Sequence, residues 1–111
     1  MQSSIKVVKP YGIMDGTQSS QFRHEISSLL EDSNSNKSIL IDFQDVTFMD
    51  SSGLGTLVLC LKSVRTAGAE LYVCSVNEQI KMLLELTSMD KVFEIYSSAE
   101  ELEKKLSQKA V

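Results

Sequence analysis

The segment from Ile39 to Phe43 reads Ile-Leu-Ile-Asp-Phe, a nearly continuous apolar run of strand length. A strand with one face in water alternates apolar and polar residues, whereas this run carries apolar side chains on both faces. Such a strand has to be covered on both sides, which is typical of parallel sheets connected through helices. The run therefore favours an α/β fold.

Short β-branched runs and segments of helical period alternate along the rest of the chain. Strands are predicted at 5–8, 39–43, 46–49, 71–74 and 92–96, and helices at 18–31, 52–67, 77–87 and from 98 onward. Because Pro10 has no N–H, the first strand should lie at a sheet edge, or break there and resume at Tyr11–Met14. This order predicts four βα units with a mostly parallel sheet and right-handed crossovers, in a single domain spanning residues 1–111.

The predicted helices each have one apolar face. In the second helix Leu54, Leu57, Leu61 and Val64 should point inward, and Gly68 suits the position just after its end. Leu59 falls on the opposite side, near Thr56, Lys62 and Ser63, where it is either incidental or part of an interface. Thr17 can cap the first helix, and Ser98 with Glu101 forms a Ser-x-x-Glu capping box for the last.

The charge balance and the cysteines restrict the possible partners. Eleven Lys and Arg against fifteen Asp and Glu give a net charge of −4, which argues against nucleic-acid binding and polybasic membrane attachment. No secretory signal or membrane span is predicted, so we expect a cytoplasmic protein. Cys60 and Cys74 should be buried free thiols, and with the single His24 they do not make a zinc set. We expect no metal and no cofactor.

Four loops follow predicted strands at the carboxyl edge of the sheet, where parallel α/β folds place their binding sites. They cover residues 14–17, 48–53, 75–77 and 96–98. The second loop is the most unusual, because an acidic residue, two hydroxyls and two glycines stand where an extended segment turns into a helix. It is therefore the first candidate for a functional site.

Within this loop Ser51 or Ser52 should be the N-cap of the second helix. Gly53 and Gly55 would then leave backbone N–H groups uncovered, so the helix start could hold a phosphate, free or covalent. The alternative is an ordinary N-cap with glycines that serve close packing. Asp50 supplies a negative charge directly before the two hydroxyls.

An enzyme is not expected. The serines are not in a G-x-S-x-G motif, and the glycines do not complete a P-loop. His24 falls on the polar face of the first helix, so no base is placed beside Ser51. We therefore predict no catalytic residues.

The run Ile39–Gly55, with Asp-Ser-Ser-Gly-Leu-Gly at its end, strongly resembles the signature of STAS-domain anti-sigma factor antagonists. The likeness continues at Gly12–Asp15, Ala67–Leu71 and Leu83–Thr87, and so extends over most of the chain. Only Met1–Ser4 precede the first predicted strand, so the extra N-terminal strand usual in this family should be absent.

The resemblance implies a partner switch that controls transcription indirectly, as in a stress response. The unphosphorylated protein would bind an anti-sigma factor with serine kinase activity, which phosphorylates Ser51, and a PP2C-type phosphatase would reverse the step. Asp15 and Asp50 match acidic positions beside the phosphorylated serine. The surroundings and the partner-binding surface are expected to comprise Asp15, Asp50, Ser52, Gly53, Leu54, Thr56 and Leu59. The alternative is a STAS scaffold or accessory subunit of a signalling or transport complex, without its own switch.

Overall fold

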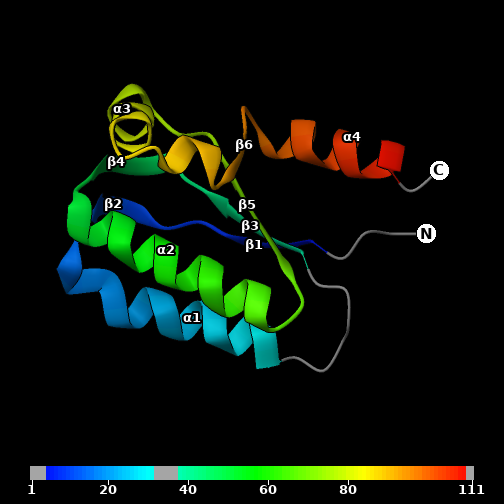
Figure 1. The fold of residues 1–111 in the computed structure, drawn as a ribbon, viewed down its shortest axis with the longest axis horizontal. Helices are drawn as coiled ribbons and strands as arrows, with labels where there is room; N and C mark the ends of the chain where they lie inside the picture. The colour runs from blue at the N-terminus through cyan, green and yellow to red at the C-terminus, as the bar shows by residue number, and fades with distance from the viewer. Residues whose placement is uncertain (1–4, 32–37, 110–111) are drawn as a thin grey trace.

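The predicted alternation of strands and helices is present in the computed structural model, which describes residues 5–31 and 38–109 (Figure 1). The strands are β1 (Ile5–Val8), β2 (Tyr11–Met14), β3 (Ser38–Asp42), β4 (Asp45–Met49), β5 (Glu70–Cys74) and β6 (Glu94–Tyr96). The helices are α1 (Ser19–Glu31), α2 (Ser51–Thr66), α3 (Glu78–Leu86) and α4 (Ala99–Lys109), with short 3₁₀ turns η1 (Gly16–Gln18) and η2 (Met89–Lys91). The expectation of a missing N-terminal strand concerns residues 1–4, which lie outside the described ranges.

The strands form two sheets. A four-stranded sheet has the order β1-β3-β5-β6, and β2 pairs with β4 in a separate two-stranded sheet. Every described pair is parallel. Both expectations for Pro10 are therefore confirmed, because β1 is an edge strand and the chain leaves that sheet at Pro10 before resuming in β2.

The four-stranded sheet is covered on both faces. Ile39, Ile41 and Val73 belong to the larger core cluster, which also receives side chains from α1, α2 and α3. Leu40 and Tyr72 point to the other face, where they meet Leu102 of α4. Figure 1 shows α1 and α2 side by side on one side of the sheet and α4 on the other. This two-sided burial is what the apolar run at 39–43 predicted.

The inward face of α2 agrees with its sequence, and Leu54, Leu57, Leu61 and Val64 are all buried. The outward face of α2 differs from the sequence prediction at one position. Leu59 is 44% exposed, but Thr56 is only 5% exposed, so the prediction that both lie on an open side is wrong. Thr56 is covered because α1 packs there, with the Ser19 and Thr56 hydroxyl oxygens 2.6 Å apart.

Both cysteines are buried free thiols, as predicted. Burial raises the pKa of Cys60 to about 11, which keeps this thiol protonated near neutral pH. Over residues 5–31 and 38–109, no cluster of His, Cys, Asp and Glu is placed to hold a metal ion. In the same ranges no helix is both long and apolar enough to span a bilayer.

Candidate functional site

The candidate site forms where the carboxyl ends of β2 and β4 meet the start of α2. Met14 and Met49, the last residues of these two strands, lie opposite each other in the parallel pairing. The next amide, that of Asp50, donates to the carbonyl oxygen of Met14 at 3.4 Å. The predicted loops at 14–17 and 48–53 are thus side by side, although about 35 residues separate them in the chain.

Asp50 caps α2. Its backbone is extended, and its Oδ1 accepts a hydrogen bond from the Gly53 amide at 2.9 Å. The prediction that Ser51 or Ser52 is the N-cap is therefore wrong. Asp and Ser are both good N-caps, and the contact between Asp50 and Met14 selects Asp50 over the two serines.

Because Asp50 does the capping, the hydroxyl of Ser51 is left free. Ser51 is the first residue of α2 and is exposed. Within residues 5–31 and 38–109 its side chain has no hydrogen-bond partner. The first amides of a helix have no intrahelical acceptor, and the positive end of the helix dipole lies beside them. The position therefore suits a hydroxyl that receives a phosphate.

The two glycines of the motif differ in their surroundings. A Cβ on Gly53 would lie 2.9 Å from the carbonyl carbon of Met14 and 3.1 Å from Cγ of Met49, so no side chain fits. A Cβ on Gly55 would have no heavy atom within 4 Å. Close packing, the alternative offered by the sequence, thus explains Gly53 but not Gly55.

Asp15 belongs to the same edge of the molecule. It caps η1, where its Oδ1 accepts from the Thr17 amide at 2.9 Å and from the Thr17 hydroxyl at 2.6 Å. These two hydrogen bonds lower the pKa of Asp15 below its ordinary value of 3.8. The expectation that Thr17 caps the first helix is wrong, because Thr17 lies inside η1, which precedes α1, and its hydroxyl donates to Asp15.

The turn after Asp15 lies against the second serine of the motif. A Cβ on Gly16 would be 3.7 Å from Cβ of Ser52 and 3.9 Å from its hydroxyl oxygen. Ser52 is exposed, whereas Leu54 and Thr56 are buried beneath the helix start. Of the expected site residues, Asp15, Asp50, Ser51 and Ser52 therefore line the surface, and Leu54 and Thr56 support it from inside.

Two side chains of the α3 start hold β4 in place, and the sequence did not single them out. The amide of Gln79 accepts from Met49 N at 2.9 Å and donates to Met49 O at 2.8 Å. The Asn77 amide caps α3 and also donates to the carbonyls of Val46 and Thr47 at 3.3 and 3.2 Å. These amides cover the edge of β4 as a neighbouring strand would. In the sequence, only the position of Asn77 in the predicted loop 75–77 indicated that one of these two residues lies near the site.

Apolar side chains lie exposed beside the site. Ile13 of β2 is 53% exposed and Phe48 of β4 is 45% exposed, and the two are partners in the parallel pairing. Both directly precede residues of the site, since Met14–Asp15 and Met49–Asp50 follow them. Exposed aromatic and aliphatic side chains next to a polar feature are typical of protein-binding surfaces.

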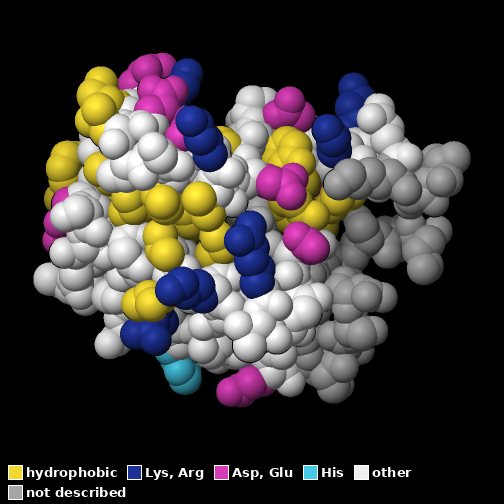
Figure 2. All heavy atoms as spheres, in the orientation of Figure 1, with side chains coloured by type: hydrophobic (Ala, Val, Ile, Leu, Met, Phe, Trp, Pro, Cys, Tyr) yellow, Lys and Arg dark blue, Asp and Glu magenta, His cyan; other side chains and the backbone are white. Residues whose placement is uncertain are grey.

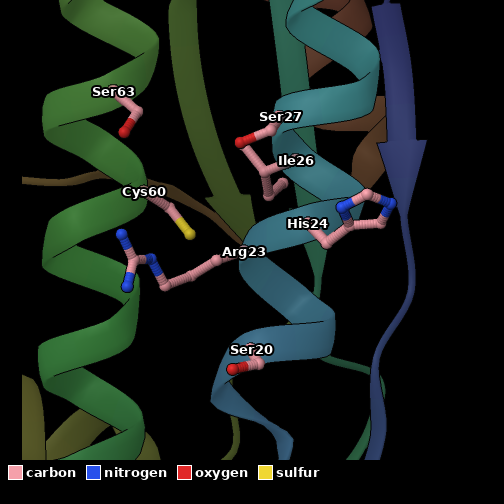
Figure 3. A pocket seen from close by; sticks show the side chains of 7 residues that line it. All are labelled: Ser20, Arg23, His24, Ile26, Ser27, Cys60 and Ser63. Atoms are coloured by element: carbon pink, nitrogen blue, oxygen red, sulfur yellow. The ribbon is translucent and has the colours of Figure 1, made fainter.

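A separate hollow of about 230 Å³ lies between α1 and α2 (Figure 3). Its lining comprises Ser20, Arg23, His24, Ile26, Ser27, Cys60 and Ser63. Figure 3 shows His24 directed away from α2, and this residue is exposed, as the sequence predicted. None of the residues that line this hollow comes from the motif at 48–55.

Comparison with known proteins identifies the family. A family model described as the STAS domain matches residues 1–102. The chain belongs to the STAS-domain family. The resemblance stated from Ile39–Gly55 and its flanking segments is thereby confirmed.

The curated relatives of this STAS chain include regulators of sigma factors. It is 35% identical over 60 residues to an anti-sigma F factor antagonist of Paenibacillus polymyxa, covering 54% of this chain and 51% of that one. It is 31% identical over 64 residues to an anti-sigma-B factor antagonist of Staphylococcus aureus, covering 58% and 59% of the two chains. The aligned parts thus span about half the length of these relatives.

Solved structures confirm the fold. A candidate anti-sigma factor antagonist from Thermotoga maritima superposes with a TM-score of 0.80 at 26% identity, covering 91% of this chain and 86% of that one. The anti-sigma factor antagonist SpoIIAA in its unphosphorylated form superposes with a TM-score of 0.75 at 16% identity, covering 96% of this chain and 91% of that one. A murine solute carrier 26 anion transporter superposes with a TM-score of 0.80 at 16% identity, covering 99% of this chain and 18% of that one. The STAS fold thus occurs in regulators and in transporters, so the function has to be argued from the site.

Proposed function

We propose that this chain is a non-enzymatic anti-sigma factor antagonist that works by partner switching in the cytoplasm. In its unphosphorylated form it binds an anti-sigma factor with serine kinase activity, which frees a sigma factor. Phosphorylation of Ser51 by that kinase releases the complex, and a PP2C-type phosphatase restores the binding form. The names of its curated relatives support the regulatory part of this proposal.

The observation that carries the proposal is that Asp50 caps α2 while the Ser51 hydroxyl beside it makes no hydrogen bond in the described ranges. Asp50 satisfies the helix start with its bond to the Gly53 amide, so the structure does not need the Ser51 hydroxyl. That hydroxyl is exposed and unbonded within the described ranges. A kinase and a phosphatase can reach it without unfolding the chain, and the modification breaks no internal contact.

The electrostatics of the site favour release of a partner over loss of the fold. A phosphate adds about −1.5 to −2 charges. Like unit charges roughly 6 Å apart cost about 3 kcal/mol at an effective dielectric of about 20, before solvent and salt reduce this. The start of α2 offsets up to about 1 kcal/mol. A partner that must desolvate the phosphate beside Asp15 and Asp50 has no such compensation.

The size of this effect is sufficient for a switch. A penalty of about 3–4 kcal/mol on the complex lowers affinity by roughly 10²–10³. The exposed pair of Ile13 and Phe48 next to the site provides an apolar surface for the unmodified complex. Introducing a dianion beside such a surface opposes its burial.

The test uses the purified chain, MgATP and each purified anti-sigma factor kinase of the source organism. We expect one kinase to bind the wild type and to phosphorylate it at Ser51, as mapped by mass spectrometry. Ser51→Ala should bind without release, and Ser51→Asp should bind more weakly than the wild type. The same mapping on protein isolated from stressed and unstressed cells should show a change in the phosphorylated fraction.

A second candidate function is that of a STAS scaffold or accessory subunit without its own switch, because the fold is also similar to part of an anion transporter. This candidate predicts stable co-purification with larger proteins and no effect of Ser51 substitutions. A Ser51→Asp variant that binds the kinase as tightly as the wild type would contradict the electrostatic account of the switch.

A further inference from the structure

One exposed stripe of α2 begins at Ser51. At 100° per residue, Ser51, Gly55, Leu59 and Lys62 fall within an arc of about 80°, and all four are exposed. Arg65 is also exposed and follows at the end of the same side. In Figure 2, hydrophobic and cationic side chains lie next to each other along the course that α2 takes in Figure 1.

Gly55 is a gap in this stripe. It lies inside the helix, where glycine is less favourable than alanine because it loses more conformational freedom on folding. No atom of the chain requires its small size, since a Cβ there would have nothing within 4 Å. Gly53, two residues earlier, is required by the Met14 carbonyl. The absence of a side chain at Gly55 thus has no internal explanation, and bare helix backbone permits close approach from outside.

The two cations give the stripe a charge opposite to that of the whole chain, which is −4. Within residues 5–31 and 38–109, neither Lys62 nor Arg65 has a carboxylate partner. Arg65 donates from Nη2 to the Val92 carbonyl at 3.3 Å, which holds its side chain between α2 and η2. An acidic group on a partner would therefore find these two charges uncompensated.

We propose that this stripe is the docking surface for an acidic segment of the anti-sigma factor kinase, with Gly55 setting how closely that segment approaches Ser51. The proposal rests on the function proposed above. The segment would pack its backbone or a small residue over Gly55, an apolar side chain on Leu59, and a carboxylate near Lys62 and Arg65. Its alignment along α2 would bring the kinase to the serine at the end of the stripe.

The test measures three quantities for each variant: kinase affinity, the rate of Ser51 phosphorylation and the midpoint of urea unfolding. Gly55→Ala should raise the urea midpoint and still lower affinity and phosphorylation at least tenfold. A merely structural role of Gly55 would move stability and activity in the same direction. Ser63→Ala, at an exposed α2 position outside the stripe, is the matched control and should leave affinity unchanged.

The charge of the stripe is tested separately. Lys62→Glu should weaken binding at least tenfold and reduce its dependence on salt, whereas Lys81→Glu on α3 changes the net charge equally and should have little effect. A wild type that no kinase phosphorylates at Ser51 would contradict the proposed function together with the stripe. If the wild type is phosphorylated at Ser51 but Gly55→Ala and Lys62→Glu bind the kinase and are phosphorylated as well as the wild type, the docking proposal is wrong and the proposed function stands.

Discussion

The carbonyl group of Met14 occupies the space that a side chain on Gly53 would need. This close approach joins the end of β2 to the first turn of α2, and the hydrogen bond from Asp50 N to Met14 O reinforces it. The position of Ser51 is therefore determined by a contact between two distant parts of the chain.

Adding a methyl group at Gly53 should destabilise the protein. Because backbone atoms would have to move, Gly53→Ala is expected to lower the free energy of unfolding by about 1–3 kcal/mol. Gly55→Ala is the matched control and should raise it by about 0.5–1 kcal/mol, since the site is open and alanine favours helix. Urea denaturation of both variants measures the difference, and equal effects of the two would contradict the close contact.

The capping assignment predicts opposite outcomes for neighbouring residues. Asp50→Ala removes the acceptor for the Gly53 amide and should cost about 0.5–2 kcal/mol of stability. Asp50→Asn keeps an acceptor oxygen and should cost less. Ser51→Ala should stay within about 0.5 kcal/mol of the wild type, because its hydroxyl makes no bond in the described structure. Thermal or urea unfolding checks this, and a large loss for Ser51→Ala would move the cap to Ser51.

Gln79 should protect the backbone of Met49 from solvent. Gln79→Ala removes two hydrogen bonds from Met49 and leaves its N–H and C=O without those partners, at a cost of about 1–3 kcal/mol. The Met49 amide should therefore exchange faster with deuterium, and the rate of Ser51 phosphorylation should fall as β4 loosens. Gln44→Ala, at an exposed position, is the control. Unchanged exchange at Met49 would show that Gln79 does not hold this strand.

The Thr17 hydroxyl should keep Asp15 ionised to lower pH. Hydrogen bonds from Thr17 lower the pKa of Asp15, so the stability from this contact is present above 3.8 and is lost as the pH falls through the lower folded value. Thr17→Val removes the hydroxyl donor and should shift the pKa of Asp15 upward, toward 3.8. Carboxyl NMR titration measures it, with Thr47→Val as a control because the Thr47 hydroxyl donates to the Gly12 carbonyl. An unshifted titration in Thr17→Val would assign the effect to the backbone amide alone.

The order of elements, the buried strand at 39–43 and the inward face of α2 could be predicted from the sequence, because hydrophobic periodicity is a local property of the chain. Gly68 after α2 was also predictable, since its φ of 79° is a conformation that glycine adopts without strain. The motif at 48–55 indicated the site through the types and spacing of its residues.

Other features depended on contacts between distant segments. Asp50, Ser51 and Ser52 are all suitable caps, and only the pairing with Met14 selects Asp50. Thr56 is buried because α1 lies over it, and Gln79 matters because α3 begins beside β4. Local patterns along the chain therefore determined which elements form, and they indicated that the serine stands at the start of a helix. Packing between residues far apart in sequence decided which side chain caps the helix and which hydroxyl stays free, because no local pattern records those contacts.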